Sequence, residues 1–306
     1  MVDSLAPVET SPLAPPLPSP APRRRLHVVL FAATLVTLTM AGAWFWADSG
    51  LEAFGWKALS PQVLAHGLPY ALLVVLILGA HEMGHYFACR YYGVSATLPY
   101  FIPGIPMPIG TFGAVIRIRS PFPSRRALFD IAAAGPIAGF AVALPVLAIG
   151  VALAHTAPDV SEPHGLFLGP PLISWLLERG LHGDANLQVG SIYGAAWVGM
   201  LVTSLNLLPV GQLDGGHAVF AVSPTLHRAV SWIAIAAFAV FVVGQAVLHR
   251  TVSGYSLWLV ILLILRGRHP RLIDEITPLD RPRRLVGAAL ALMLVLTFIP
   301  VPLQVL

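Results

Sequence analysis

The sequence predicts an all-α, polytopic membrane protein with about six or seven transmembrane helices. Of its 306 residues, 57% are hydrophobic and only 10% are charged, and the mean hydropathy is +0.78. A soluble domain typically carries about 25% charged residues. The apolar segments are also long enough to cross a bilayer as helices, unlike the short alternating segments of a barrel.

Seven apolar segments are candidate spans. The first follows Arg23-Arg24-Arg25 and ends in the aromatic cluster Trp44-Phe45-Trp46, with no obvious cleavage site, so we expect a helix and not a cleaved signal peptide. The sixth is short, and the seventh ends in Pro300-Val301-Pro302, so either could be re-entrant. The candidate segments are residues 26–47, 63–89, 127–154, 190–208, 227–248, 253–266 and 285–303.

The basic residues indicate how the chain is oriented. If the N-terminus is cytoplasmic and the spans alternate, fifteen of the eighteen Lys and Arg residues fall on the cytoplasmic side. This bias is typical of inner-membrane topology. The basic residues thus serve as topology signals, and a nucleic-acid partner is not expected. The single cysteine, Cys89, excludes an intramolecular disulfide.

The second segment contains the run His81-Glu82-Met83-Gly84-His85. A charged residue at the centre of a span costs roughly 2.5–3.5 kcal/mol on insertion scales, so an ionisable cluster there indicates a functional site. Residues i and i+4 share one helix face, and His81 and His85 can therefore reach the same metal ion. Glu82 points to the side of this pair, where it could act on a metal-bound water.

The stretch between the second and third segments is predicted to form a re-entrant loop or a short β-hairpin. Residues 98–110 are apolar but rich in proline, which prevents a continuous helix. From Val115 to Ser120, apolar and basic residues alternate as in a half-buried strand. Such backbone survives at membrane depth where it lines a cavity, and its edge could pair with an extended peptide. An amphipathic interfacial loop is the alternative.

A third metal ligand is needed, because catalytic zinc usually has three protein ligands and one position for water. Asp214 is the lone carboxylate at the end of the fourth segment, between Leu213 and Gly215-Gly216. Pro209 and the glycines break the helix, which would let the carboxylate turn inward. The second and fourth segments run in the same direction, so their cytoplasmic halves can lie at one depth. Asp-Gly is also a common turn, and a simple turn residue is the alternative.

Together these motifs resemble the site-2 protease family of intramembrane zinc metalloproteases. The resemblance covers residues 63–220 and rests on His81–His85, Asn206-Leu207-Leu208-Pro209 and Leu213-Asp214-Gly215. The segments 110–119 and 134–139 are similar to compact members without an inserted PDZ domain. The implied site comprises one Zn²⁺ held by His81, His85 and Asp214, with Glu82 as general base and acid and Asn206 beside the substrate or its oxyanion.

The resemblance also implies hydrolysis of peptide bonds in or near the transmembrane segments of membrane-protein substrates. A zinc-activated water would attack the carbonyl, with Glu82 passing its proton to the leaving amine. The expected partners are a transmembrane protein substrate and the lipid bilayer, and the oligomeric state is unknown. Composition and hydropathy together predict a disordered cytoplasmic tail (1–25), a membrane-embedded catalytic core (26–220) and additional C-terminal transmembrane helices (221–306).

Two other functions stay open. A metal ion transporter would need polar residues along a path on both sides of the membrane, whereas this cluster lies in one half. A non-catalytic membrane-protein binding protein would not need the intact set of four site residues. A cytoplasmic N-terminus and a compact length suit an integral protein of a bacterial inner membrane.

Three further features have ordinary structural interpretations. Gly135 to Gly139 should allow close helix packing, since small residues let helices approach. His217 is expected to be a solvated loop histidine, and contact with the substrate or with a metal ligand is the alternative. Asp130 is expected to form an interfacial ion pair with Arg125 or Arg126.

Overall fold

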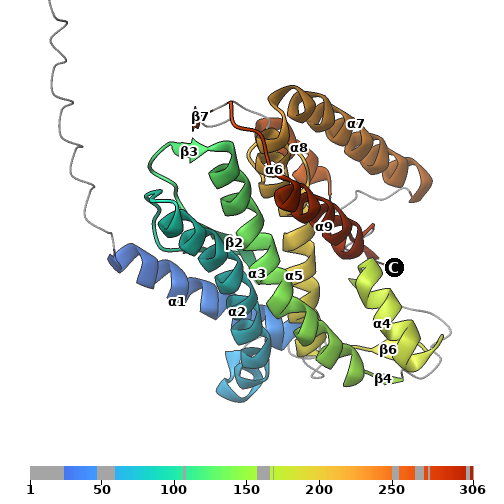
Figure 1. Cartoon of the computed structure of the whole chain (residues 1–306). Helices are drawn as coiled ribbons and strands as arrows, with labels where there is room; N and C mark the ends of the chain where they lie inside the picture. Colours follow the sequence, from blue (N-terminus) through green and yellow to red (C-terminus); the bar gives the residue numbers. More distant parts are fainter. Residues whose placement is uncertain are drawn as a thin grey trace, which may run out of the picture.

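The computed structural model is mostly helical, and four of its helices are long and apolar enough to cross a membrane (Figure 1). They are α1 (Arg24–Ala41) with the π-helical turn η1 (Gly42–Trp46), α2 (Pro61–Tyr91), α3 (Arg125–Ala152), and most of α7 (Pro224–His249). The prediction of a helical, multi-span protein is confirmed to this extent. The structure describes residues 24–46, 59–105, 108–156, 166–167, 169–249, 255–265, 272–274, 276–300 and 304–305.

The remaining helices are shorter. Two of them, α5 (Ser191–Leu207) and α8 (Ser256–Leu265), are predominantly apolar. Three others are α4 (Leu172–His182), α6 (Asp214–Val222) and α9 (Arg281–Thr297). The sequence pattern gave no separate helix at α4 or α6. The first helix begins at Arg24, two residues before the predicted start, and most of the predicted tail lies outside the described residues.

Strands β1 (Tyr100–Pro103) and β2 (Thr111–Val115) pair antiparallel between α2 and α3. The alternation predicted a strand from Val115 to Ser120, but β2 ends at Val115. The alternating stretch instead contacts the chain before β1, where the Arg119 backbone N–H donates to Ser95 O over 2.8 Å. Beyond β2 the pairing is reduced to a single bridge at Ile118, so the strand lies earlier than the alternation suggests.

Three shorter strand pairs join distant parts of the chain. β3 (Phe122–Ser124) pairs parallel with β7 (Leu272–Asp274), β4 (His155–Thr156) pairs antiparallel with β6 (Leu187–Gln188), and β5 (Leu166–Phe167) pairs antiparallel with β8 (Gln304–Val305). Because β3 directly precedes α3, its pairing with β7 brings the C-terminal region against the start of that helix.

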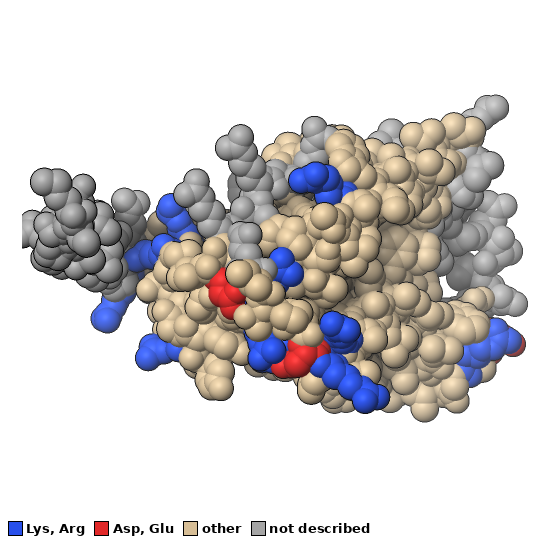
Figure 2. Space-filling model, turned by 45° about the horizontal axis from the view of Figure 1, so that its top comes forward, with Lys and Arg blue, Asp and Glu red and all other residues tan. Residues whose placement is uncertain are grey.

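The core lies where α2, α3 and α5 pack together, with α1 crossing beside α2 (Figure 1). Its largest fully buried side chains include Trp197, Tyr70 and Leu147, one from each of these three helices. The indole of Trp197 donates to Gly169 O over 2.8 Å, which satisfies its only polar atom. On the face shown in Figure 2, the surface is largely uncharged, and basic side chains are more widespread than acidic ones.

The C-terminal end of α2 and the N-terminal ends of α3 and α9 meet at one side of the molecule. Arg283 binds Asp130 through two contacts, Nε to Oδ1 at 2.9 Å and Nη2 to Oδ2 at 2.7 Å, and the Tyr92 hydroxyl donates to the same carboxylate. The prediction that Asp130 forms an ion pair with Arg125 or Arg126 is therefore wrong. Arg126, which shares the helix face of Asp130, instead lies 4.0 Å from Asp280, and α9 presents the two-pronged guanidinium of Arg283 to the Asp130 carboxylate.

The loop that follows β1 is held by two aromatic side chains from different helices. The Trp46 indole donates to Pro108 O over 2.8 Å, and the Tyr70 hydroxyl lies 2.8 Å from Ile109 O and 3.0 Å from Pro108 O. Both side chains are buried, and their rings stack with centroids 5.9 Å apart. The loop is thereby fixed to η1 and α2.

We expect Tyr70→Phe to destabilise the protein, because it leaves the part-buried Ile109 carbonyl without its donor. The cost should be about 1–3 kcal/mol, which corresponds to a melting temperature lower by roughly 2–4 °C for each kcal/mol. Thermal unfolding in detergent would measure it. The matched control is Tyr91→Phe, because the Tyr91 side chain is 83% exposed and its hydroxyl should not matter. Equal melting temperatures for the two variants would contradict this account.

Candidate active site

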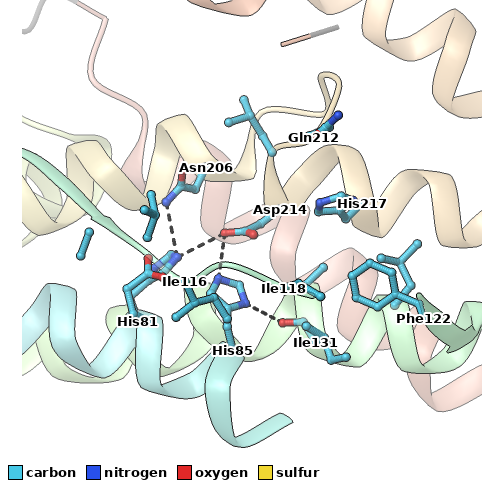
Figure 3. Close-up of a pocket in the computed structure, with 16 residues that line it drawn as sticks. His81, His85, Ile116, Ile118, Phe122, Ile131, Asn206, Gln212, Asp214 and His217 are labelled. Atoms are coloured by element: carbon cyan, nitrogen blue, oxygen red, sulfur yellow. Dashed lines mark hydrogen bonds and ion pairs between the residues drawn. The ribbon is translucent and has the colours of Figure 1, made fainter. Parts of the chain in front are cut away.

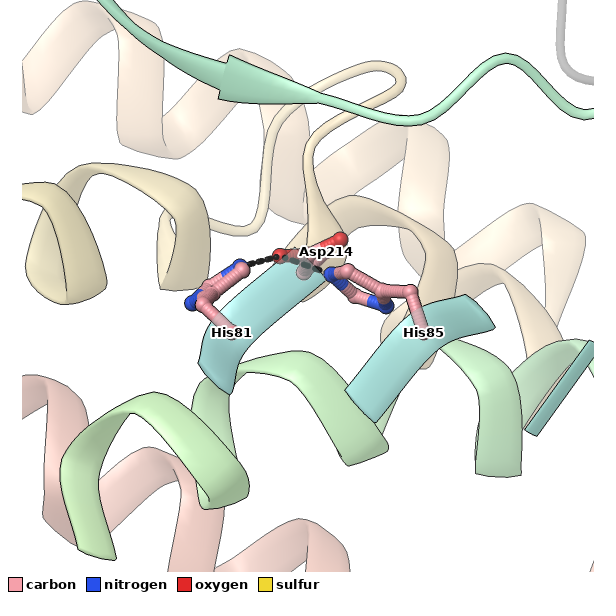
Figure 4. Close-up of side chains that lie close together, drawn as sticks. All are labelled: His81, His85 and Asp214. Atoms are coloured by element: carbon pink, nitrogen blue, oxygen red, sulfur yellow. Dashed lines mark hydrogen bonds and ion pairs between the residues drawn. The ribbon is translucent and has the colours of Figure 1, made fainter. Parts of the chain in front are cut away.

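The two histidines of α2 face a single carboxylate on α6. His81 Nε2 lies 3.2 Å from Asp214 Oδ2, and His85 Nε2 lies 3.3 Å from the same oxygen (Figure 4). His81 and His85 are 2% and 7% exposed, so the three groups meet inside the protein. Residues 133 positions apart in the chain thus converge on one point.

The donor set fits one metal ion. The three ligand atoms lie within 4.8 Å of one another. In a tetrahedral zinc site with bonds of about 2.0 Å, ligand atoms are about 3.3 Å apart, which is the size of the two N···O distances. Two imidazole nitrogens and a carboxylate oxygen are also donors that zinc accepts. Within the described residues, this is the one group of three or more His, Cys, Asp or Glu side chains arranged in this way.

Hydrogen bonds orient the imidazoles. His85 Nδ1 donates to Ile131 O over 2.7 Å, which leaves Nε2 directed at Asp214 (Figure 3). Such a backbone partner fixes the tautomer and the ring plane of a ligating histidine. Beside His81, the Asn206 amide nitrogen lies 3.4 Å from Nε2. Asn206 stands one residue before the end of α5 and thus reaches the ligand set from a third helix.

The glycines of α3 make room for both histidines. A Cβ at Gly135 would overlap the His85 imidazole, and one at Gly139 would come within 3.1 Å of His81 Nδ1. On the opposing helix, a Cβ at Gly84 would overlap the backbone carbonyl of Ala134. The packing interpretation of this glycine segment therefore agrees with the structure. More specifically, it is the imidazoles that occupy the space left by the absent side chains.

Asp214 is positioned by the turn between α5 and α6. It is the first residue of α6, and the turn passes through Gly211, whose φ of +53° suits glycine. A Cβ at Gly215 would overlap Leu207 O, and one at Gly216 would be too close to Val210 O and Gly211 O. The two glycines thus let the start of α6 lie against the end of α5. The aspartate begins a separate short helix and does not end the fourth span.

Two side chains of α7 bind the carbonyls of this turn. Ser231 Oγ donates to Pro209 O over 3.0 Å, and His227 Nε2 donates to Gly211 O over 3.2 Å. Both side chains are buried. The sequence carries no signal for either contact, because the partners are backbone atoms of a turn whose shape only the fold defines.

Glu82 lies beside the ligands in a cavity of about 240 Å³. Its side chain is 6% exposed, and its carboxylate accepts a hydrogen bond from the Ile116 backbone N–H, just after β2. All five residues singled out in the sequence line this cavity. The polar lining residues are His81, Glu82, His85, Asn206, Gln212, Asp214 and His217.

Two polar lining residues differ from the sequence expectation. His217 belongs to α6, three residues after Asp214, and faces the cavity beside Phe122, with ring centroids 6.2 Å apart (Figure 3). The expectation of a solvated loop histidine is wrong, because the turn ends before Asp214 and the histidine is already helical. Gln212 was not expected, and its place in the turn is what brings it to the cavity rim.

Comparisons with known proteins agree with this geometry. The chain is 31% identical to the probable zinc metalloprotease EGY2, chloroplastic, of Arabidopsis thaliana over 79% of its own length and 43% of the relative's. It is 38% identical to the probable zinc metalloprotease EGY1, chloroplastic, of the same plant over 58% of its length and 33% of the relative's. The probable zinc metalloprotease EGY3, chloroplastic, of Oryza sativa subsp. indica is 28% identical over 76% of the chain and 42% of the relative.

The chain spans less than half the length of these relatives. Their names place them in chloroplasts, which gives no support to the prediction of a bacterial inner membrane. Residues 69–248 match the model of peptidase family M50, and this stretch includes both histidines, Glu82, Asn206 and Asp214. The resemblance to site-2 proteases is thereby confirmed, and the chain belongs to peptidase family M50.

Proposed function

We propose that this chain is an intramembrane zinc endopeptidase that hydrolyses peptide bonds in or near the transmembrane segments of membrane-protein substrates. One observation carries the proposal. Two histidines of an apolar 31-residue helix and an aspartate of another helix meet at one buried point, with a glutamate in the same cavity. The names of the EGY relatives, which are probable zinc metalloproteases, support the same activity.

In this proposal, His81, His85 and Asp214 hold one Zn²⁺. When bound, zinc lowers the pKa of a coordinated water and polarises the carbonyl of the substrate. The imidazoles contribute neutral nitrogen ligands. The His85 ring is oriented by its hydrogen bond to Ile131 O, and both rings pack against the glycines of α3. The carboxylate contributes the single negative charge of the ligand set.

Glu82 is the proposed general base and acid. Its carboxylate accepts a proton from the attacking water and then donates it to the leaving amine, so no second titratable group is required. The backbone hydrogen bond from Ile116 helps to hold the carboxylate, which lines the cavity. Asn206 is proposed to donate its amide N–H to the substrate carbonyl oxygen as negative charge develops there.

The hairpin is the proposed substrate platform. A transmembrane helix must unwind before cleavage, because its carbonyls are already hydrogen-bonded within the helix. Residues from Ala114 to Ile116 line the cavity, and a strand runs above the three ligand side chains in the view of Figure 4. An unwound substrate could add to it as a further strand. We further propose that the hairpin is re-entrant and that α5, α8 and α9 complete a bundle of six or seven spans around the catalytic core.

The alternatives fit the described residues less well. A metal transporter needs successive binding sites along a path, whereas the described residues contain one ligand group. Burying a carboxylate costs free energy. A non-catalytic binding protein has no use for a buried glutamate that would explain this cost. Neither alternative accounts for Glu82.

Glu82→Gln should retain zinc but lower cleavage of a transmembrane substrate by at least about 100-fold, because the amide cannot accept the water proton. Asp214→Asn should lose zinc as well as activity, because it removes the charged ligand. Bound zinc would be measured by elemental analysis of the purified protein, and cleavage on gels. Unchanged cleavage by Glu82→Gln, with a substrate that the wild type cuts, would refute the proposed mechanism.

Gly135→Ala should weaken zinc binding by roughly tenfold or more without changing any ligand, because the new methyl group displaces the His85 imidazole. Zinc titration with a competing chelator would measure the affinity. Gly180→Ala on α4 is the matched control, because a Cβ there meets nothing within 4 Å. If both variants bind zinc like the wild type, the ligand geometry described here is incorrect.

Val115→Pro should reduce cleavage while zinc stays bound, because proline removes a backbone N–H from the end of β2 and disturbs its pairing with Tyr100. Val115→Thr keeps both the N–H and the branched shape and should retain activity. Cleavage that is equal in the two variants would rule out the strand as the substrate platform.

A further inference from the structure

A second cavity, of about 520 Å³, lies between the start of α1, the last turns of α2 and the chain on both sides of the hairpin. It is separate from the metal ligands, and none of its lining residues is acidic. The lining residues are Arg24, His27, Val28, Tyr86, Ala96, Thr97, Leu98 and Arg119.

Positive charge is concentrated around this cavity. Arg24 comes from α1 and Arg119 from the chain after β2, so two separate segments direct guanidinium groups to the same space. A third guanidinium group, that of Arg90, donates a hydrogen bond to the Tyr86 hydroxyl over 3.4 Å, and Tyr86 itself lines the cavity. Guanidinium and phenol donors together are well suited to a phosphate group, which accepts several hydrogen bonds.

Apolar side chains lie directly beside these cations. Val28 and Leu98 line the cavity and are 66% and 49% exposed. Exposed apolar groups on long hydrophobic helices are typical of surfaces that face lipid. A ligand with an anionic head and an apolar tail would satisfy both parts of the site.

The other cavity lined by arginine is a weaker candidate. It is lined mainly by apolar side chains of α3, α6 and α9, and its Arg283 is already bound by Asp130 and Asp280. A guanidinium that is satisfied by two carboxylates has little attraction left for an anion.

We propose that the cavity at Arg24 and Arg119 binds the phosphate headgroup of an anionic phospholipid, with an acyl chain along Val28 and Leu98. The site joins α1 to the hairpin, which are already linked by His27: its Nδ1 donates to Pro99 O over 3.0 Å, and its ring stacks on Tyr100. A bound lipid would strengthen this link and thereby hold the hairpin over the metal ligands.

The test is lipid binding by the purified full chain in an uncharged detergent. Phosphatidylglycerol, phosphatidylcholine or inorganic phosphate is added, and binding is followed by native mass spectrometry and by the melting temperature. Phosphatidylglycerol should bind and raise the melting temperature, whereas the other two should have little effect. In Arg24→Gln/Arg119→Gln, its affinity should fall about 30-fold, since each basic residue near an anionic headgroup contributes about a fivefold factor.

The matched control is Arg228→Gln/Arg281→Gln, which removes the same charge from two exposed positions outside the cavity and should bind phosphatidylglycerol like the wild type. Arg24→Lys/Arg119→Lys keeps the charge and should retain most of the affinity. Equal losses in the glutamine variant and its control, equal binding of the two lipids, or full stabilisation by phosphate alone would each overturn the proposal. So would an unchanged affinity for phosphatidylglycerol in the glutamine variant.

Discussion

The close approach of α2 and α3 is the constraint on which the site depends. Apolar side chains gain little by leaving lipid for a helix interface, so helices in membranes associate mainly through tight packing. Here the packing relies on Gly84, Gly135 and Gly139, and the space opposite the last two glycines is taken by the His85 and His81 side chains. The same contact therefore joins two long helices and presents two imidazoles toward a third element. Stability and the arrangement of the ligands cannot be separated at this interface.

The third ligand depends on a different kind of support. Asp214 stands at a change of direction between two helices, where backbone carbonyls would otherwise lack partners. Gly215 and Gly216 allow the chain to turn tightly, and Ser231 and His227 of α7 bind two of the exposed carbonyls. The position of the carboxylate is thus determined by a helix that supplies none of the proposed ligands. The motif residues supply the proposed ligands, whereas the residues packed around them determine where the ligand atoms lie.

Much of this could be predicted from the sequence. The i, i+4 histidines in an apolar helix and the Asp-Gly-Gly turn led to the residues that converge, because helix geometry and the rarity of ionisable groups in spans are local properties. The predicted partner of Asp130 and the predicted position of the strand β2 were wrong, because both depend on which distant segment of the chain lies next to them. The same limit applies to His217: its place in the cavity follows from the start of α6, and helix starts are poorly defined when a turn precedes them. Local sequence patterns identified the candidate ligands and the glutamate, whereas the residues around them are determined by tertiary contacts.

The two-pronged contact between Arg283 and Asp130 links the C-terminal region to the start of α3. The family match ends at residue 248, yet Arg283 lies beyond it and Asp130 lies at the start of the helix that supports His85. The parallel pairing of β3 with β7 joins the same two regions. A chain shortened to the matched segment would leave the Asp130 carboxylate with Tyr92 as its partner and would uncover the buried side chain of Phe129. A chain shortened to the matched segment would therefore lose contacts that fix the start of α3, the helix whose glycines lie opposite His81 and His85.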